Sequence, residues 1–377
     1  MTSNQDYQCG DVINVDTPFV HVLNLDQKNQ YCDYCFSEYS DLKRCNQCKQ
    51  MFYCGKSCQR KDWKHHKWEC LDIFSKKFSI IEKNLPRFLL RLYLWIENNP
   101  DSLNERRKFP DKNPNSNRCF TDLMTHYEQI QMDPIRMAAF RSLCSKFESL
   151  NSFELDTEKL FEYFCRICIN AFTITNCEFN EIGTGLYLAE SQLDHSCLPN
   201  ASPVFNGQRI AIRAIRPIKQ GDLITVNYVD LKLSKNIRQK NLLQQYYFQC
   251  KCQRCETNDP IDCQKLKELI TRMDKAIDRK NWFKAYEMGQ KTMPMFKQIY
   301  GECHPDLTVQ MIRMLKLYLQ LIPQNNDFGF SINLNEILKQ INETKQAINR
   351  TNFYDDELYR IFVQIINDLQ LPFDRIF

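Results

Sequence analysis

The sequence lacks an uninterrupted apolar run of the roughly 18 residues that a membrane-spanning helix needs. Its first ten residues are polar and charged, without the apolar segment of a secretory signal. The composition is otherwise ordinary, because 43% of the 377 residues are apolar and 12% are aromatic, which is enough for a sizeable core and two or more domains. We therefore expect a soluble intracellular protein with no membrane partner.

Cysteine is abundant, and its count of 19 is odd. A chain without a secretory signal is expected to meet a reducing compartment, which disfavours a full disulfide framework. Metal binding is then the first interpretation of so many thiols.

Four pairs of zinc-type ligands, with spacers of two or three residues, lie within about forty positions of one another. Short spacers let both members of a pair face one tetrahedral ion, and a segment this short has too little core to fold without metal. The sequence predicts a module that holds two zinc ions at residues 32–70, although spacing alone leaves open which ligands share an ion. We expect His65, beside one ligand, to be exposed. The ligands are Cys32, Cys35, Cys45, Cys48, Cys54, Cys58, His66 and Cys70.

The net charge of +4 conceals a local excess, because residues 41–70 hold eight Lys and Arg against three Asp and Glu. An electrostatic partner is therefore expected near the zinc module. These cations could meet nucleic-acid phosphates. No base-reading motif accompanies them, so we favour a solvated face or a peptide-docking face over DNA binding.

The hydrophobic pattern predicts helices on both sides of a central β-rich block, and therefore an α+β fold. Residues 72–170 are predicted to be mostly helical, interrupted by a loop at Lys108–Arg118, and residues 261–377 to form two or three helical hairpins. Residues 210–215 and 223–229 are predicted strands. The first of the helices is expected to bury Leu85, Phe88, Leu89, Leu92, Trp95 and Ile96.

Several motifs carry a resemblance to a known family. Residues 32–70 resemble a MYND finger, and a later set of motifs resembles a SET domain with a post-SET zinc loop. The order of these parts, over nearly the whole chain, is similar to that of the SET and MYND domain lysine methyltransferases. The later motifs are Asn170–Ile174, Glu181–Tyr187, Asp194–Asn200, Asn227–Tyr228, Tyr246–Cys250, Cys252 and Cys255.

The resemblance implies a SET-domain β-fold split by a MYND finger and a helical insert, with a TPR-like helical domain at the C-terminal end. The implied segments are the remnant of the N-terminal SET part (1–31), the finger (32–70), the helical insert (71–170), the SET core (171–230), the post-SET loop (231–258) and the helical domain (259–377).

The resemblance also implies how the ligands share three zinc ions. Cys32, Cys35, Cys54 and Cys58 would hold one ion, and Cys45, Cys48, His66 and Cys70 a second. Cys197, Cys250, Cys252 and Cys255 would hold the third. Such fingers usually recognise proline-containing peptides, and we expect a monomer.

The activity that the resemblance implies is an S-adenosylmethionine-dependent protein-lysine N-methyltransferase. It would act on histone or non-histone proteins, as a chromatin regulator in the nucleus and cytoplasm. Methyl transfer needs a neutral lysine amine held in line with the methyl group, and a narrow apolar channel disfavours the charged amine. Tyr228 would stand beside the methyl group, with Phe172 and Tyr246 lining the channel. The implied cofactor contacts are His126, Asn170, Ala171, Asp194, His195, Tyr246 and Phe248.

Two departures from the family pattern keep a rival hypothesis open. No Gly-x-Gly turn precedes the finger, where only glycine lets the backbone approach the cofactor, and Asp194 stands where the family has Asn. The alternative is a catalytically weak or inactive zinc-dependent adaptor, or transcriptional co-regulator, that docks partners through the finger.

Overall fold

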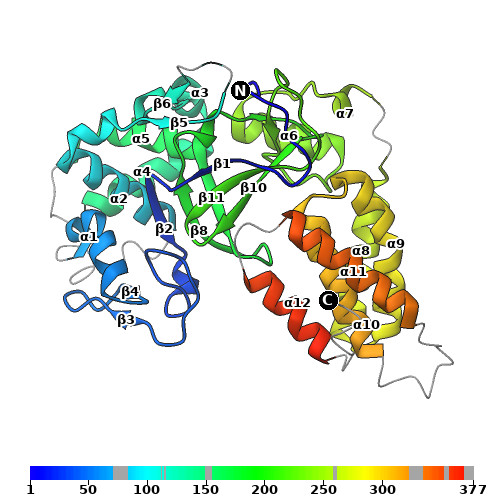
Figure 1. The fold of residues 1–377 in the computed structure, drawn as a ribbon. Helices are drawn as coiled ribbons and strands as arrows, with labels where there is room; N and C mark the ends of the chain where they lie inside the picture. The colour runs from blue at the N-terminus through cyan, green and yellow to red at the C-terminus, as the bar shows by residue number, and fades with distance from the viewer. Residues whose placement is uncertain are drawn as a thin grey trace.

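The computed structural model describes residues 1–70, 84–111, 113, 116–148, 155–257, 261–321, 334–351 and 356–368. Within these ranges, no helix has both the length and the apolar character needed to cross a membrane. The predicted α+β fold is confirmed. Figure 1 shows the zinc module (blue) on one side of a central group of strands (green), and the C-terminal helices (yellow to red) on the other.

Two antiparallel sheets form the centre. Strands β1 (Val12–Asp16), β11 (Arg209–Ala214) and β10 (Ala201–Asn206) make one sheet in the order β1-β11-β10. Strands β2 (Val20–Leu23), β8 (Glu181–Leu186) and β7 (Ala171–Thr175) make the other in the order β2-β8-β7. Because β1 and β2 pair with strands from much later in the chain, the N-terminal segment is part of both sheets.

The β-rich predictions hold in part. The run 210–215 is strand β11, whose Ile210 and Ile212 are fully buried. The run 223–229 narrows to β12 (Thr225–Val226), which pairs in parallel with β9 (Asp194–His195). After β12 the chain leaves the strand, and Val229 packs with Cys197, Cys250 and Cys255.

The zinc module consists of β3 (Lys43–Arg44), β4 (Phe52–Tyr53) and α1 (Lys56–Glu69). Helix α2 (Asn84–Asn98) lies against it and shares its core. Of the residues expected in the core of this helix, Phe88, Leu89, Leu92 and Ile96 are buried and Trp95 is half-buried. The expectation for Leu85 is wrong, because this side chain in the first turn is 39% exposed, whereas the next residues, Pro86 and Arg87, are buried.

The prediction that residues 72–170 are mostly helical is confirmed over their described part, and residues 71–83, 112, 114–115 and 149–154 lie outside that part. Besides α2, the helices of this stretch are α3 (Tyr127–Met132), α4 (Pro134–Glu148) and α5 (Thr157–Asn170). The predicted loop at 108–118 begins and ends in two short paired strands, β5 (Arg107–Lys108) and β6 (Asn117–Arg118).

After the sheets, the described part continues with α6 (Lys235–Tyr246) and α7 (Gln253–Glu256). The C-terminal helices follow: α8 (Cys263–Asp278), α9 (Trp282–Tyr300), α10 (Pro305–Leu321), α11 (Leu334–Thr351) and α12 (Asp356–Asp368). Leu266, Met273 and Ala285 are fully buried in this part of the molecule. A disulfide joins Cys9 to Cys303, which the metal-binding interpretation of the cysteines did not anticipate.

A buried carboxyl group lies beside the first sheet. Glu190 has no exposed surface, and Asn14 of β1 donates a 2.6 Å hydrogen bond to its Oε1. Burial, reinforced by the nearby Asp16 carboxylate, raises the pKa of Glu190 to about 8. The side chain is therefore protonated in the folded protein over a pH range in which the unfolded chain has already lost this proton.

We expect the Glu190→Gln protein to become more stable than the wild type as the pH rises from 6 to 8. The folded pKa lies above the unfolded one, so ionisation of Glu190 in the unfolded chain lowers wild-type stability by roughly 2 kcal/mol over these two pH units. Glutamine keeps the bond from Asn14 and has no such loss. Urea unfolding of both zinc-loaded proteins at the two pH values measures the difference, with the exposed Glu128→Gln as control. A stability gap independent of pH would contradict the assignment.

Candidate zinc centres and active site

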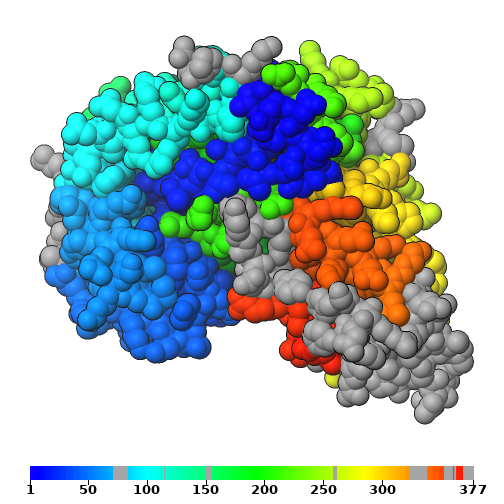
Figure 2. All heavy atoms as spheres, in the orientation of Figure 1, coloured from blue at the N-terminus to red at the C-terminus, as the bar shows by residue number. Residues whose placement is uncertain are grey.

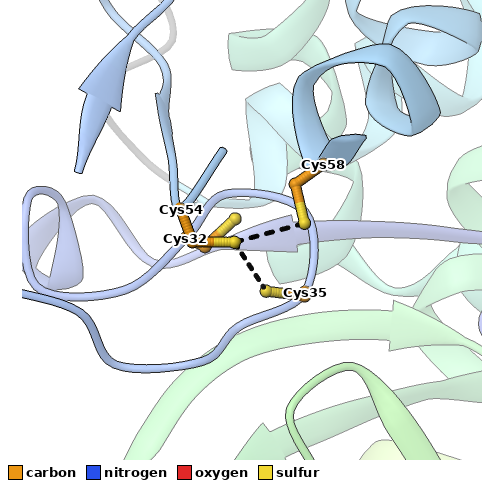
Figure 3. A group of neighbouring side chains, drawn as sticks. All are labelled: Cys32, Cys35, Cys54 and Cys58. Atoms are coloured by element: carbon orange, nitrogen blue, oxygen red, sulfur yellow. Dashed lines mark hydrogen bonds between the residues drawn. The ribbon is translucent and has the colours of Figure 1, made fainter. Parts of the chain in front are cut away.

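The first ligand group brings together Cys32 and Cys35 from the loop after β2, Cys54 after β4 and Cys58 in α1 (Figure 3). Their four sulfurs lie within 4.8 Å of one another, with 3.7 Å between Cys35 and Cys54 and 3.3 Å between Cys54 and Cys58. Zinc–sulfur bonds of about 2.3 Å in a tetrahedron separate the sulfurs by about 3.8 Å. The group therefore fits a tetrahedral zinc ion.

The second group consists of Cys45, Cys48, His66 and Cys70, all buried. The sulfurs of Cys45 and Cys70 are 3.8 Å apart, and His66 Nε2 lies 3.4 Å from the sulfur of Cys48. The other ring nitrogen of His66 faces a carboxylate oxygen of Glu69 at 3.6 Å. A carboxylate behind a ligating histidine orients the ring and raises its basicity, as in many zinc sites.

The third group consists of Cys197, which follows β9, and Cys250, Cys252 and Cys255 around α7. The sulfurs of Cys197 and Cys255 are 3.5 Å apart. Two side chains of α6 support the group from behind. The buried Arg238 donates from Nε to the sulfur of Cys197 at 3.3 Å, and Gln239 exchanges two hydrogen bonds with the backbone of Cys250, at 2.7 and 2.9 Å.

The three groups are the ligand sets that the resemblance implied, and spacing alone had left their membership open. The expectation for His65 is wrong, because this side chain is only 3% exposed. Its ring packs edge-on against Trp95 of α2, with 4.5 Å between the ring centroids. The helix that carries the ligand His66 thus buries the preceding residue, His65, against α2.

A buried charge cluster fastens the finger to α2. Arg91 pairs with Asp62 and, at 3.7 Å, with Glu69, while Arg87 lies 3.5 Å from Asp33. All five side chains are at least 98% buried. Burial opposes ionisation of Asp62 and Glu69, but the Arg91 guanidinium and the other groups around each carboxyl together outweigh it and hold the pKa of each below its ordinary value. This cluster was not predicted from the sequence, where its signal is two arginines four residues apart within an apolar helix.

The eight basic side chains of the finger behave as a solvated face. All are exposed, and three of them cover aromatic rings. Arg44 lies over Phe52, Lys64 over Trp95 and Lys67 over Trp68, the last at 4.3 Å from the ring centroid. Three of the eight cations therefore make cation–π contacts within the protein itself.

Half-buried aromatic rings gather beside the third ligand group. The ring of Tyr228 lies 4.8 Å from that of Tyr246, 5.3 Å from that of His195 and 6.4 Å from that of Phe248. The Tyr228 hydroxyl donates to the carbonyl of Leu193. Burial raises the pKa of both tyrosines, so their hydroxyls stay neutral at any ordinary pH.

His195 connects these rings to the cysteines. Its Nδ1 accepts a 2.9 Å hydrogen bond from the backbone N–H of Tyr228, and its Nε2 lies 3.3 Å from the sulfur of Cys197. Burial lowers the pKa of His195 to about 4, so the ring is neutral. Because both nitrogens are engaged, His195 offers a ligand its ring face, and its main role is to hold Tyr228 in place.

The remaining predicted site residues lie at the junction of α5 and β7. Asn170 ends α5 and donates to the carbonyls of Met124 and Arg166, at 2.7 and 2.8 Å. It thereby holds the turn that ends in His126, whose ring lies 5.3 Å from that of Tyr247. Ala171 and Phe172 begin β7, and Phe172 packs on the same core as Tyr228 while meeting Tyr187 edge-on.

Opposite charges flank the rings. The Asp194 side chain in β9 is 74% exposed, and the Met1 nitrogen lies 3.9 Å from it. Arg118 of β6 is half-buried and lies within electrostatic range of both Asp194 and Tyr228. Burial lowers the pKa of this arginine, although the nearby Asp122, Tyr228 and Asp194 act in the opposite direction and raise it. Arg118 was interpreted as the end of a plain loop, and nothing in its local sequence distinguishes it from its neighbours.

Comparison with known proteins adds to this geometry. A model of the MYND finger matches residues 32–70. Histone-lysine N-methyltransferase SMYD3 of Homo sapiens is 29% identical over 319 residues, which cover 81% of this chain and 71% of that protein. The chain is thus similar to a SET and MYND domain methyltransferase over most of its length.

Two further relatives agree. N-lysine methyltransferase SMYD2 of Homo sapiens is 29% identical over 263 residues, 68% of this chain and 57% of that protein. Histone-lysine N-methyltransferase ASHR1 of Arabidopsis thaliana is 31% identical over 257 residues, 67% of this chain and 51% of that protein. The chain thus spans between about half and seven tenths of the length of these SET and MYND domain proteins.

We expect Arg91→Met to destabilise the finger and α2 by about 3–5 kcal/mol, because it leaves Asp62 and Glu69 as buried, unpaired carboxylates. The midpoint and slope of urea unfolding, followed by tryptophan fluorescence in zinc-containing buffer, measure the loss. Arg141→Met on the exposed face of α4 serves as the control and should be neutral. Equal stability of the two variants would show that the buried cluster does not hold the finger in place.

Proposed function

We propose that this protein is an S-adenosylmethionine-dependent protein-lysine N-methyltransferase. The observation that carries the proposal is the cluster of half-buried aromatic rings around Tyr228, held by His195 against a zinc-type cysteine group. It occurs in a homologue of proteins that are named lysine methyltransferases.

The ring cluster suits the demands of the reaction. When bound, S-adenosylmethionine supplies an electrophilic methyl group. Tyr228 and Tyr246 present neutral, half-buried rings, and Phe172 adds a third aromatic wall at the start of β7. Such a lining disfavours an ammonium ion, so a lysine amine between these rings loses its proton more readily and is held for in-line attack.

The chemistry of the surrounding donors fits the cofactor. An amino-acid group carries an ammonium and a carboxylate, and an adenine ring offers a flat aromatic surface. Asp194 would take the ammonium, Arg118 the carboxylate and Phe248 the adenine, with His195, Tyr246, Asn170, Ala171 and His126 around them.

The wider assignments are part of the same proposal. We assign the protein histone or non-histone substrates, a monomeric state and a place in the nucleus and cytoplasm. The segments 1–31, 32–70, 71–170, 171–230, 231–258 and 259–377 are the proposed domains. The finger exposes Trp63 and Tyr39, aromatic side chains of the kind that dock proline-containing peptides.

The test is binding of S-adenosylhomocysteine by calorimetry, followed by transfer of labelled methyl groups to candidate proteins. We expect micromolar binding, and we expect Tyr228→Phe to reduce kcat at least about tenfold, because the hydroxyl bond to Leu193 orients the ring. Tyr127→Phe in α3, which packs against Phe161, is the matched control. A folded protein with three zinc ions that binds no S-adenosylhomocysteine would contradict the proposal and favour the adaptor function.

Arg118→Ala should weaken S-adenosylhomocysteine about tenfold, since it removes the ion pair to the carboxylate. It should leave 5′-methylthioadenosine, which lacks the amino-acid group, unaffected. Calorimetry with both ligands separates the two effects. Arg106→Ala is the control, because this arginine precedes the same hairpin but is exposed and pairs with Asp122. Equal loss for both ligands would mean that Arg118 supports the fold and does not bind the carboxylate.

A further inference from the structure

The disulfide between Cys9 and Cys303 joins two parts of the molecule that are far apart in sequence. Cys9 lies just before β1, and Cys303 lies between α9 and α10, with 6.2 Å between their Cα atoms and 294 positions between them. Figure 2 shows the N-terminal segment (dark blue) lying against the C-terminal helices (yellow and orange). The bond therefore ties the central sheets to the C-terminal helices.

The surroundings of the bond form a close-fitting junction. Arg213 of β11 donates to the carbonyls of Gly10 and Arg350, at 2.8 and 2.9 Å. A side chain at Gly10 would meet the Arg350 carbonyl at 2.9 Å, and its φ of +94° also favours glycine. The residue after Cys9 thus lies directly against the end of α11.

The ion pairs between the two parts are weaker than this bond. Glu178, in the turn between β7 and β8, pairs with Lys316 of α10 at 3.1 Å, and Asp306 of the same helix lies 3.9 Å from Lys232. These pairs are at least partly exposed, and such pairs contribute little in water. The covalent bond is therefore the strongest single restraint on how the C-terminal helices lie against the sheets.

The chemistry of the chain suggests that this bond opens and closes. Eleven other cysteines lie in three groups that bind zinc only as reduced thiolates. A disulfide in a protein that keeps so many reduced thiols is typically transient and redox-sensing. Cys9 is half-buried, so a small thiol can reach its sulfur, whereas Cys303 is buried.

We propose that Cys9 and Cys303 form a redox latch that fixes the C-terminal helices against the central sheets. The oxidant is a small disulfide such as glutathione disulfide. Both S–H bonds break and one protein S–S bond forms, while the glutathione disulfide is reduced to two glutathione thiols, which retain the two protons. Excess glutathione reverses the exchange. The latch does not depend on the proposed methyl transfer.

The first test uses the full, zinc-loaded chain in glutathione buffers of increasing oxidised fraction. Free thiols are trapped with N-ethylmaleimide, and peptides are identified by mass spectrometry without reduction. We expect the peptide linking Cys9 to Cys303 in the oxidised buffers and its loss in the reduced ones, with three zinc ions retained throughout. Absence of the linked peptide from every zinc-retaining sample would overturn the proposal.

The second test measures what the latch does. Hydrogen exchange of the segment around Gly10 and of the end of α11 should rise about threefold or more on reduction, because both segments lie at the junction. Cys9→Ser and Cys303→Ser should each match the reduced protein in both buffers. Cys144→Ser, which alters a half-buried cysteine outside the zinc groups, should respond like the wild type. Equal exchange in oxidised and reduced wild type would overturn the latch.

Discussion

The structure depends on the convergence of thiolates. Each of the three ligand groups holds its donor atoms within 4.8 Å of one another, where negative sulfurs repel unless a cation lies between them. Zinc supplies that cation, and because no such group exists in the unfolded chain, the binding energy of the metal is folding energy. The residues that pack against the finger and against the third ligand group are therefore stabilised through metal binding.

Two chains of contacts connect the zinc ligands to the rest of the protein. In the finger, His66 meets Glu69, which meets Arg91 of α2, so the second metal group and the helical insert share one buried cluster. Beside the third group, Cys197 lies against His195, and His195 accepts from the backbone of Tyr228. A ligand of the third group is thus two hydrogen-bonded steps from the residue proposed to stand beside the methyl group, which makes the zinc site part of the support of the active site.

The sequence was most informative where chemistry limits the choice of residue. Ligand spacing predicted the two-zinc finger, and apolar periodicity predicted α2 and the C-terminal helices. Burial depends on neighbours, so Leu85 and His65 were predicted wrongly, in opposite directions. The cluster around Arg91 and the bond between Cys9 and Cys303 were missed because each joins segments distant in sequence. The local sequence around the Arg91 cluster shows only two arginines within an apolar helix, and the local sequence around Cys9 and Cys303 shows no pattern that pairs them.

The charges beside the aromatic rings bear on the departure of Asp194 from the family pattern. An asparagine there would offer donors and acceptors without net charge, whereas Asp194 offers acceptors and a negative charge. Asp194 faces the Met1 nitrogen at 3.9 Å, and Arg118 lies nearby, half-buried and positive, so Asp194 and Arg118 form one pair of opposite charges among the charged groups of the site. That pair complements a zwitterionic amino-acid group better than either charge alone, because each charge favours one end of the ligand and disfavours the reversed orientation. The substitution of Asp for Asn is thus consistent with retained cofactor binding as long as Arg118 remains in place.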